Sequence, residues 1–385
     1  MSEEKLFPKL RFNGFDDEWQ SHKLGEISDV TKLAGFEFTE YVNYSDKGNI
    51  IALRGLNVKN NKLDLTDVKY IDNSDFTKLN RSKLYLGDLL FTYVGTIGEV
   101  ALISEDDKYY LAPNVCRIRC NNEVNPDLLK FYFNTIIIKK EILKYVTKSS
   151  QPALSMENIR KFKIKLPNIV EQEKIANFLI SVDNKIELIE KKYEAYVNFK
   201  KYLMQQIFAQ KLRFDYEIVK LKNISKINKG KQLNKDAMIE DGEYYVLNGG
   251  QEPSGYTNEW NTPENTITIS EGGNSCGFVN FNEEKFWSGG HCYFLSDLDN
   301  QTDTYYLYSY LKFKEEHIMR LRVGSGLPNI QKSDIENFKV QLVSKEEQNK
   351  ISNLLLSADK KVDFIKNQKE NFENFKHGLL QQMFV

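Results

Sequence analysis

Residues 175–208, IANFLISVDNKIELIEKKYEAYVNFKKYLMQQIF, decide the fold because their apolar side chains recur at alternating steps of four and three. This spacing keeps one apolar seam along a single long α-helix, which favours packing against a partner helix. Residues 351–384, ISNLLLSADKKVDFIKNQKENFENFKHGLLQQMF, repeat the pattern. The alternative is that each amphipathic helix packs only on its own domain, but two matched seams in one chain favour mutual pairing. The predicted seam contains Ile175, Leu179, Val182, Ile186, Ile189, Ile351, Leu355, Ala358, Val362 and Ile365.

The two helices belong to an internal repeat. Residues 126–208 align with residues 302–384 at a constant offset of 176 positions, without a gap. A weaker match opens each half, where residues 23–28 (KLGEIS) resemble residues 220–225 (KLKNIS) at an offset of 197. The first copy is therefore about 21 residues longer, and we place the extra length between residues 30 and 125. The repeat predicts two heads, residues 1–151 and 210–327, each followed by a helical spacer, residues 152–209 and 328–385.

Each head is rich in strand signals. The GTIG run at residues 95–98 predicts a turn between two strands, and the second copy has a longer, glycine-rich run at residues 271–277. A helix is expected to start near Pro126 and near Asp303, because Pro suits a first helical turn and Asp can cap one. The predicted strands are residues 89–94, 99–103 and 115–119 in the first copy and 266–269 and 292–295 in the second.

Two copies of one unit tend to pack about an approximate two-fold axis. Such an axis across the paired helices makes them antiparallel and separates the heads. The 32 steps from Ile175 to Ile207 span about 48 Å at ~1.5 Å each, which is comparable with the ~34 Å turn of B-DNA. We therefore predict an α+β fold in which two heads are separated by an antiparallel coiled coil with a pseudo-two-fold internal repeat.

Composition limits the functional classes. The 385 residues are 41% hydrophobic and 28% charged, with only 8 Pro, which is typical of a folded protein with more than one domain. No stretch approaches the ~18 apolar residues that span a bilayer, and the start lacks a basic end followed by an apolar run, so we expect a cytoplasmic protein. The net charge of -1 argues against a chain that grips DNA unaided. Partner subunits would have to supply phosphate contacts, or the basic residues would have to gather on one face.

In their order and duplication, several segments resemble the specificity subunits of type I restriction-modification systems. The resemblance covers essentially the whole chain and is carried by FPKLRF at residues 7–12, GDLLFT at 87–92 with GTIG at 95–98, LP and EQ at 166–172, and the helix ends QQIF at 205–208 and QQMF at 381–384. The second copy departs from the pattern at residues 342–344, where LVS replaces LPN. The resemblance implies that the heads are two target-recognition domains.

Each domain would read one half of an asymmetric, interrupted site in double-stranded DNA. The helices would set the gap between the halves and dock two modification subunits, which methylate adenine. The resemblance implies no catalysis by this chain. S-adenosylmethionine, ATP and magnesium would then belong to partner subunits, the modification subunits and the restriction or translocase subunits.

Base reading needs forked donors and amide groups on short loops, because Arg pairs with guanine O6 and N7 while Asn or Gln pairs with adenine N6 and N7. Any single candidate has the alternative role of a turn former, so the set is a stronger prediction than its members. The candidates in the first head are Arg54, Asn57, Lys59, Thr92, Tyr93, Thr96, Asn114, Ser149, Ser150 and Gln151. Those in the second head are Lys229, Lys231, Asn248, Gln251, Asn274, Ser275, His291 and Ser325.

The sequence lacks the motifs expected for methyl transfer, ATP hydrolysis and metal binding. The chain lacks the Asp/Asn-Pro-Pro-Tyr/Phe tetrapeptide that holds a flipped adenine and the phosphate-binding motif GxxxxGK[ST], so we expect neither methyl transfer nor ATP hydrolysis. Cys276, His291 and Cys292 lack close Cys-x-x-Cys spacing, and we predict no metal site. The main alternative function is a non-catalytic, two-headed scaffold that binds proteins or glycans, which the missing basic excess favours. An enzyme with an unrecognised site is the second alternative.

Overall fold

The computed structural model describes residues 7–146, 152–212, 214–324, 326 and 328–385, which belong to two compact units. Unit 1 comprises Met1–Ile189 and Gln368–Val385, and unit 2 comprises Glu190–Asn367. Helix α6 (Ile169–Phe208) begins in unit 1 and ends in unit 2, whereas α11 (Lys345–Gln382) begins in unit 2 and ends in unit 1. Each unit therefore combines one head with parts of both long helices. The predicted division into two heads and two helical spacers stays a prediction, because it follows the sequence repeat, whereas these units are defined by contacts in the structure.

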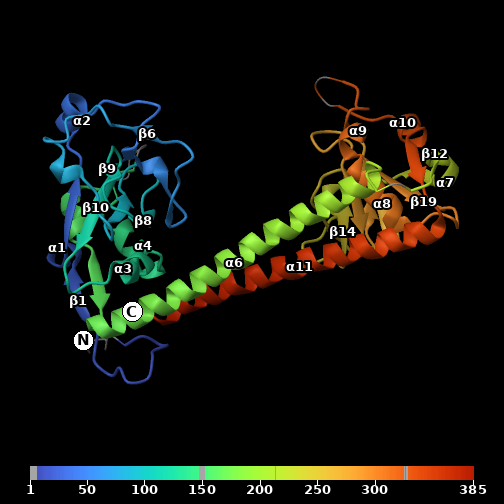
Figure 1. Cartoon of the computed structure of the whole chain (residues 1–385). Coiled ribbons are helices and arrows are strands. Elements are labelled where there is room, and N and C mark those ends of the chain that lie inside the picture. The colour runs from blue at the N-terminus through green and yellow to red at the C-terminus, as the bar shows by residue number, and fades with distance from the viewer. Residues whose placement is uncertain (1–6, 147–151, 213, 325, 327) are drawn as a thin grey trace. The chain divides into compact units, whose positions relative to one another are not determined.

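Unit 1 contains a four-stranded antiparallel sheet and a three-stranded mixed sheet (Figure 1). In spatial order the first consists of β2 (Ser28–Lys32), β10 (Val115–Cys120), β7 (Leu89–Thr92) and β8 (Val100–Leu102), and the second of β6 (Lys69–Tyr70), β3 (Ile51–Leu53) and β9 (Tyr109–Leu111). Two strand pairs complete the unit, β1 (Gln20–Lys23) with β11 (Lys163–Leu166) and β4 (Val58–Lys59) with β5 (Lys62–Leu63). The short helices are α1 (Leu24–Ile27), α2 (Gly35–Tyr41), α3 (Pro126–Tyr132), α4 (Ile136–Leu143) and α5 (Met156–Arg160), with 3-10 turns at Gly55–Asn57 and Asn80–Ser82.

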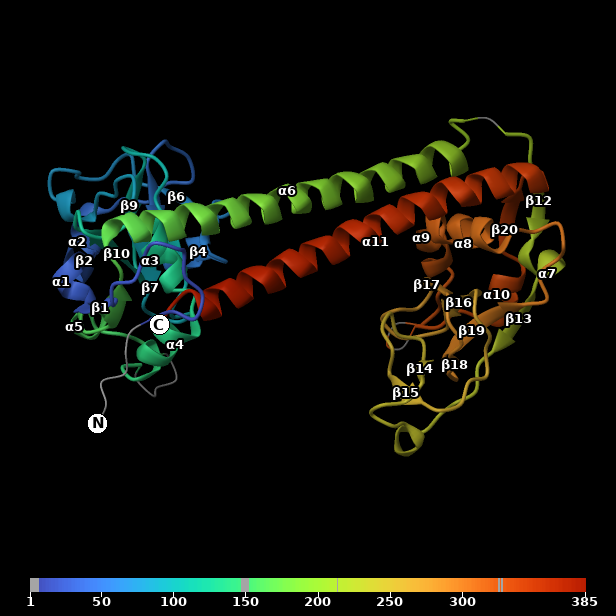
Figure 2. The same ribbon diagram turned by 90° about the horizontal axis from the view of Figure 1, so that it is seen from below.

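Unit 2 repeats this plan. Its four-stranded sheet has the order β13 (Lys226–Lys229), β19 (Cys292–Ser296), β16 (Thr266–Ser270) and β17 (Val279–Asn282), and its three-stranded sheet has the order β15 (Gly255–Thr257), β14 (Tyr244–Leu247) and β18 (Trp287–Ser288). Strand β12 (Glu217–Lys220) pairs with β20 (Lys339–Leu342), as β1 pairs with β11. The helices are α7 (Leu221–Ile224), α8 (Thr304–Phe313), α9 (Glu315–Met319) and α10 (Lys332–Glu336), with a 3-10 turn at Lys235–Ala237. Helix α8 lies between the four-stranded sheet and α11 (Figure 2).

The predicted strands are confirmed, except that β7 ends at Thr92 and not at residue 94, and glycine explains the turn that follows it. Gly95 has φ +77° and Gly98 has φ +101°, values in the left-handed region that glycine enters without a steric penalty. The Gly98 N–H donates to Thr92 O at 3.1 Å, and in unit 2 the Gly277 N–H donates to Ser270 O at 2.8 Å. The second turn is therefore one residue longer than the first.

The helix starts near Pro126 and Asp303 are also confirmed. Asn125 Oδ1 accepts the Leu128 N–H at 3.0 Å at the start of α3, and Asp303 Oδ1 accepts the Tyr306 N–H at 2.8 Å at the start of α8. These side-chain caps satisfy donors that the first helical turn leaves unpaired.

Buried glutamines fasten the starts of the long helices to these caps. Gln172 Oε1 accepts the Asn125 N–H at 3.0 Å, and Gln348 Oε1 accepts the Asp303 N–H at 2.8 Å. Each glutamine also donates twice from Nε2 to backbone carbonyls, with distances between 2.8 and 3.0 Å. Gln172 and Gln348, which are equivalent in the repeat, thus have the same structural role in both copies.

The end of each long helix packs in the core of the head that belongs to the other copy. Phe384, just past the end of α11, meets Trp19 and Tyr132 in unit 1 with ring centroids 6.1 and 5.7 Å apart. Phe208, at the end of α6, meets Tyr306 in unit 2 at 5.7 Å. Because aromatic side chains bury large apolar areas, these contacts contribute strongly to each core.

Between these ends, the helices bury the predicted seam. Eight of its ten residues are buried, and the remaining two, Ile186 and Val362, are half-buried. In unit 1 the Lys376 ammonium lies 2.6 Å from Asp183 Oδ1. In unit 2 Lys200 forms an ion pair with Asp359. Within the described ranges, every helix is too short or too polar to cross a lipid bilayer.

Candidate nucleic-acid interface

Three loops meet at one edge of the four-stranded sheet in each unit, and they carry most of the predicted DNA-binding residues. Loop edge 1 consists of residues 54–59, which follow β3 and include β4, residues 93–98 after β7 and residues 113–114 before β10. Loop edge 2 consists of residues 248–251 after β14, residues 271–277 after β16 and residues 290–291 before β19. Backbone hydrogen bonds join the loops, because the Tyr93 N–H donates to Asn114 O at 3.2 Å and the Glu271 N–H donates to His291 O at 2.9 Å.

Loop edge 1 encloses a hollow of about 430 Å³. Three predicted residues from different loops, Lys59, Thr96 and Asn114, lie on its wall. Asn114 is exposed and has φ +71°, a left-handed conformation that Asn adopts more readily than most residues. The fold thus brings together an ammonium, a hydroxyl and an amide that are far apart in the sequence.

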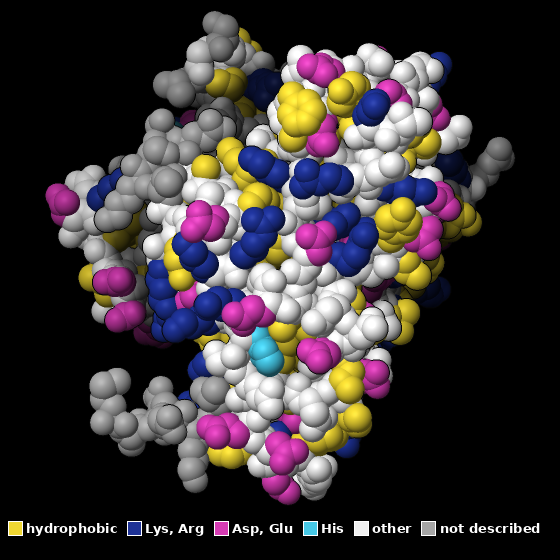
Figure 3. Space-filling view, turned by 90° about the vertical axis from the view of Figure 1, so that its left-hand side faces the viewer, with side chains coloured by type: hydrophobic (Ala, Val, Ile, Leu, Met, Phe, Trp, Pro, Cys, Tyr) yellow, Lys and Arg dark blue, Asp and Glu magenta, His cyan; other side chains and the backbone are white. Residues whose placement is uncertain are grey.

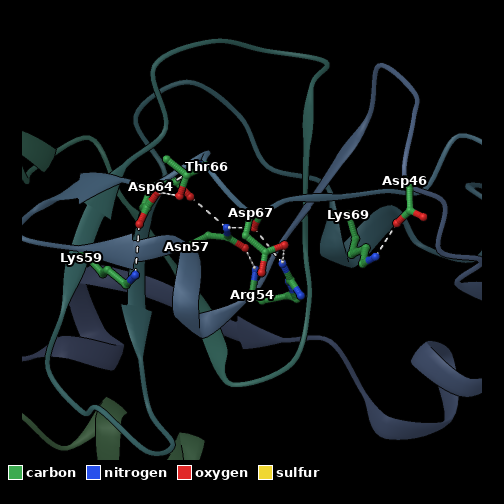
Figure 4. Close-up of polar contacts among 8 residues, drawn as sticks. All are labelled: Asp46, Arg54, Asn57, Lys59, Asp64, Thr66, Asp67 and Lys69. Atoms are coloured by element: carbon green, nitrogen blue, oxygen red, sulfur yellow. Dashed lines mark hydrogen bonds and ion pairs between the residues drawn. The ribbon is translucent and has the colours of Figure 1, made fainter. Parts of the chain in front are cut away.

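The structure corrects the predicted role of Asn57. Its side chain is fully buried, with Oδ1 accepting the Arg54 N–H at 3.0 Å and Nδ2 donating to Asp64 O at 2.9 Å and Asp67 O at 2.7 Å (Figure 4). An amide with these contacts holds the loop after β3 in shape and cannot reach a base edge. Arg54 is held beside it, because Nη2 donates to Asp67 Oδ1 at 3.0 Å.

Thr92 needs the same correction. It is buried, and its Oγ1 accepts the Glu99 N–H at 3.0 Å across the GTIG turn. Thr92 therefore fixes the turn, while Tyr93, the next residue, is half-buried at the surface of loop edge 1. The Lys32 ammonium lies 5.4 Å from the centre of the Tyr93 ring.

Lysines in and near loop edge 1 have carboxylate partners. Lys59 Nζ lies 3.1 Å from Asp64 Oδ2, and Lys69 pairs with Asp46 nearby (Figure 4). Hydrogen bonds from the Thr66 hydroxyl and N–H, and then from Lys59, lower the pKa of Asp64 to about 2. Asp64 is therefore ionised at neutral pH. Surface pairs of this kind stabilise a protein by only ~0–1 kcal/mol, so a DNA phosphate can replace the carboxylate at small cost.

In loop edge 2 the central side chain is Glu271, which the sequence did not indicate. It is buried, and its carboxylate lies 2.6 Å from Lys229 Nζ and 3.5 Å from His291 Nδ1, two of the predicted residues. The Tyr293 hydroxyl also donates to Glu271 Oε1 at 3.0 Å. The available signal was the glycine-rich run at residues 271–277, which Glu271 begins. The missed residue of the first head is Lys32, which the offset of 197 aligns with Lys229.

The other predicted residues of the second head lie around this cluster. Lys231, Gln251 and Asn274 are exposed, whereas Asn248 and Ser275 are half-buried. The Asn248 Oδ1 has no hydrogen-bond partner among the described residues. Ser149, Ser150, Gln151 and Ser325 lie outside the described residues. All of these assignments to DNA stay predictions.

Charge on the visible face of unit 1 is mixed and locally basic. Figure 3 shows Lys and Arg side chains gathered across the middle of the face that lies at the left of Figure 1, with Asp and Glu side chains between them. A net charge of -1 therefore coexists with local basic surface. In the described part of the chain, no three His, Cys, Asp or Glu side chains come together in a group that could hold a metal ion.

Comparison with known proteins identifies two matching domains. Residues 16–195 and 214–374 each match the model of the type I restriction modification DNA specificity domain. The chain is 25% identical over 415 aligned positions to the putative type I restriction enzyme MjaX specificity subunit of Methanocaldococcus jannaschii, covering 99% of this chain and 96% of that protein. It is 35% identical over 147 positions to the putative type I specificity subunit S.MpnORF638P of Mycoplasma pneumoniae, covering 38% and 39% of the two chains. The crystal structure of a type I restriction-modification S subunit from M. genitalium matches with a TM-score of 0.71 at 18% identity, covering 98% of this chain and 99% of that one.

Proposed function

Because the chain belongs to the family of type I restriction-modification DNA specificity proteins, we propose that it is the specificity subunit of such a complex. Each head reads one half of an asymmetric, bipartite site in double-stranded DNA. The observation that carries this function is the family domain present twice, with the same strand order but different side chains at the two loop edges. The chain has no catalytic role of its own.

The helices are the spacer in this proposal, paired as an antiparallel coiled coil about a pseudo-two-fold axis. Support comes from the two ion pairs, Lys376 with Asp183 and Lys200 with Asp359. The two aspartates are repeat equivalents at the offset of 176, and so are the two lysines. A two-fold axis between antiparallel helices would generate the second ion pair from the first.

The partners in this proposal are two methyltransferase subunits docked on the helices and restriction or translocase subunits joined to them. S-adenosylmethionine is then bound by the methyltransferase subunits, and ATP with magnesium by the restriction subunits. The assembly acts in the cytoplasm.

The test is single-molecule sequencing of methylated DNA from cells that express the chain with its methyltransferase partner. Replacing residues 211–330 with the corresponding segment of a relative should change one half of the methylated site and leave the other half intact. The matched control replaces the first head and should change the opposite half. A change in both halves, or a site that does not change, would contradict the proposal, and the absence of any methylated bipartite site would favour the scaffold alternative.

A further inference from the structure

The two loop edges share one set of backbone hydrogen bonds, although their loops differ in length. Tyr93 corresponds to Glu271, and Asn114 to His291, because each pair occupies the same place in a common set of backbone hydrogen bonds. The set in unit 1 is Tyr93 N–H to Asn114 O (3.2 Å), Leu154 N–H to Tyr93 O (2.9 Å) and Gly95 N–H to Pro152 O (3.1 Å). The set in unit 2 is Glu271 N–H to His291 O (2.9 Å), Ile330 N–H to Glu271 O (2.9 Å) and Gly273 N–H to Pro328 O (3.0 Å).

A lysine occupies the same position beside this frame in both units. Lys32 is the last residue of β2 and pairs with Cys116 of β10, while Lys229 is the last residue of β13 and pairs with Tyr293 of β19. Lys32 approaches the Tyr93 ring, and Lys229 forms an ion pair with Glu271. The lysine is therefore retained, while the side chain that it contacts differs between the heads.

Glu271 cannot itself contact DNA, because its side chain is 8% exposed and its carboxylate already accepts hydrogen bonds from Lys229 and Tyr293. The side chains that it contacts are accessible, since Lys229 is 50% and His291 65% exposed. A buried carboxylate in contact with two exposed side chains restricts their conformations before a ligand arrives, which lowers the entropic cost of binding. In unit 1 the Tyr93 ring takes the place of the carboxylate, and the exposed side chain at the position of His291 is Asn114.

We propose that Asn114 and His291 are equivalent base-contacting residues, one for each half of the DNA site, and that Lys32 and Lys229 contact the DNA backbone beside them. Glu271 is a positioning residue for Lys229 and His291. This inference rests on the proposed function. The side-chain chemistry predicts different bases at the equivalent position of the two halves, because an Asn amide pairs in bidentate fashion with adenine N6 and N7 and an imidazole cannot.

The lysines and the variable residues should have separable effects. Contacts to phosphates fix the register without carrying sequence information, so Lys32→Gln and Lys229→Gln should weaken binding evenly across DNA sequences. Each should also reduce the slope of log affinity against log salt by about one. The matched control is Lys222→Gln, at an exposed lysine of α7 that precedes the opposite end of β13.

The decisive experiment uses the full-length chain in complex with its methyltransferase partner. Methylation rates are measured on the parental duplex and on duplexes in which each base pair of the site is replaced in turn. We expect His291→Asn to shift the preference at one base pair of the second half about tenfold, and Asn114→His to shift it at the equivalent base pair of the first half. Unchanged preferences, or an even loss on every duplex, would overturn the assignment.

Three further variants keep the outcome decisive. If either swapped protein folds poorly, His291→Gln and Asn114→Gln must alter preference at the same base pairs, because both side chains are exposed. Glu271→Gln should weaken discrimination at the His291 base pair alone, whereas a merely structural role would lower the melting temperature without changing base preference. A parental complex without a bipartite site would reject the proposed function, whereas a parental site that all these variants retain would reject only this inference.

Discussion

The two copies of the repeat differ least in their long helices and most in the loops of their heads. At the helix starts, Gln172 and Gln348 make the same three kinds of hydrogen bond. At the loop edges the backbone hydrogen bonds are shared, but Tyr93 corresponds to Glu271 and Asn114 to His291. The two copies thus share the hydrogen bonds that stabilise their folds, whereas the exposed side chains that would select a ligand differ.

The largest effect should come from the helix ends. Phe384→Ala and Phe208→Ala each remove a buried ring from the core of one unit, and such changes lower the free energy of unfolding by ~3–5 kcal/mol. Denaturant melts of the full chain would measure both losses. The matched controls are Phe375→Ala and Phe199→Ala, at repeat-equivalent positions that are 51% and 49% exposed and should change stability by less than ~0.5 kcal/mol. Equal losses in variants and controls would show that the helix ends do not belong to these cores.

The second-largest loss of stability should come from substitution of the buried glutamines at the starts of the long helices. Gln172→Ala and Gln348→Ala leave backbone groups without their partners, and each unsatisfied buried group costs ~1–3 kcal/mol. We expect similar losses of stability for the two variants, because their contacts are equivalent, and none for Gln205→Ala at an exposed position. A large difference between the losses of stability of Gln172→Ala and Gln348→Ala would show that the two glutamines are not equivalent.

The long helices and the strands could be predicted because their signals are local. The spacing of apolar residues places the first helix within Ile169–Phe208, and the GTIG turn identifies the strands on either side. The packing of each helix end in the other copy's head could not be predicted in this way. The repeat offset says which residues correspond, but not which of two equivalent cores receives Phe208 or Phe384.

A second short sequence repeat indicates that each helix end packs in the head of the other copy. KLRF occurs at residues 9–12 and again at 211–214. The Leu212 N–H donates to Gln206 O at 2.9 Å in unit 2, and the Leu10 N–H donates to Gln382 O at 2.9 Å in unit 1. The same contact is thus made within one continuous segment in unit 2 and between distant segments in unit 1.

Individual site residues were harder to predict than the loops that carry them. Asn57 and Asn114 have the same side chain on neighbouring loops, yet one amide is buried among backbone partners and the other is exposed. Only the tertiary structure separates these roles. Glu271 begins the glycine-rich run at residues 271–277, but its role is evident only because Lys229, His291 and Tyr293 surround its carboxylate.

A smaller effect should distinguish the two ion pairs of the helices. The Tyr305 hydroxyl donates to Asp359, and burial and this hydrogen bond raise the pKa of Tyr305. Asp183 has no such contact from the equivalent residue, because that residue is Leu129. Asp359→Asn should therefore lower the free energy of unfolding by about 1 kcal/mol more than Asp183→Asn does. Denaturant melts should lose this difference when Tyr305→Phe is added, and a difference that persists would contradict the assignment.

The smallest effect on stability should come from Lys59, an exposed lysine of loop edge 1. Lys59→Gln removes an ion pair with Asp64 and should change the free energy of unfolding by less than ~1 kcal/mol. Its effect should appear in DNA binding, because Lys59 lies on the wall of the hollow whereas Lys69 does not line it. Fluorescence anisotropy with labelled duplexes at several salt concentrations should give a slope reduced by about one for Lys59→Gln and an unchanged slope for Lys69→Gln. An unchanged slope for Lys59→Gln would show that Lys59 does not contact DNA and would confine the DNA contacts of the first head to the other loops.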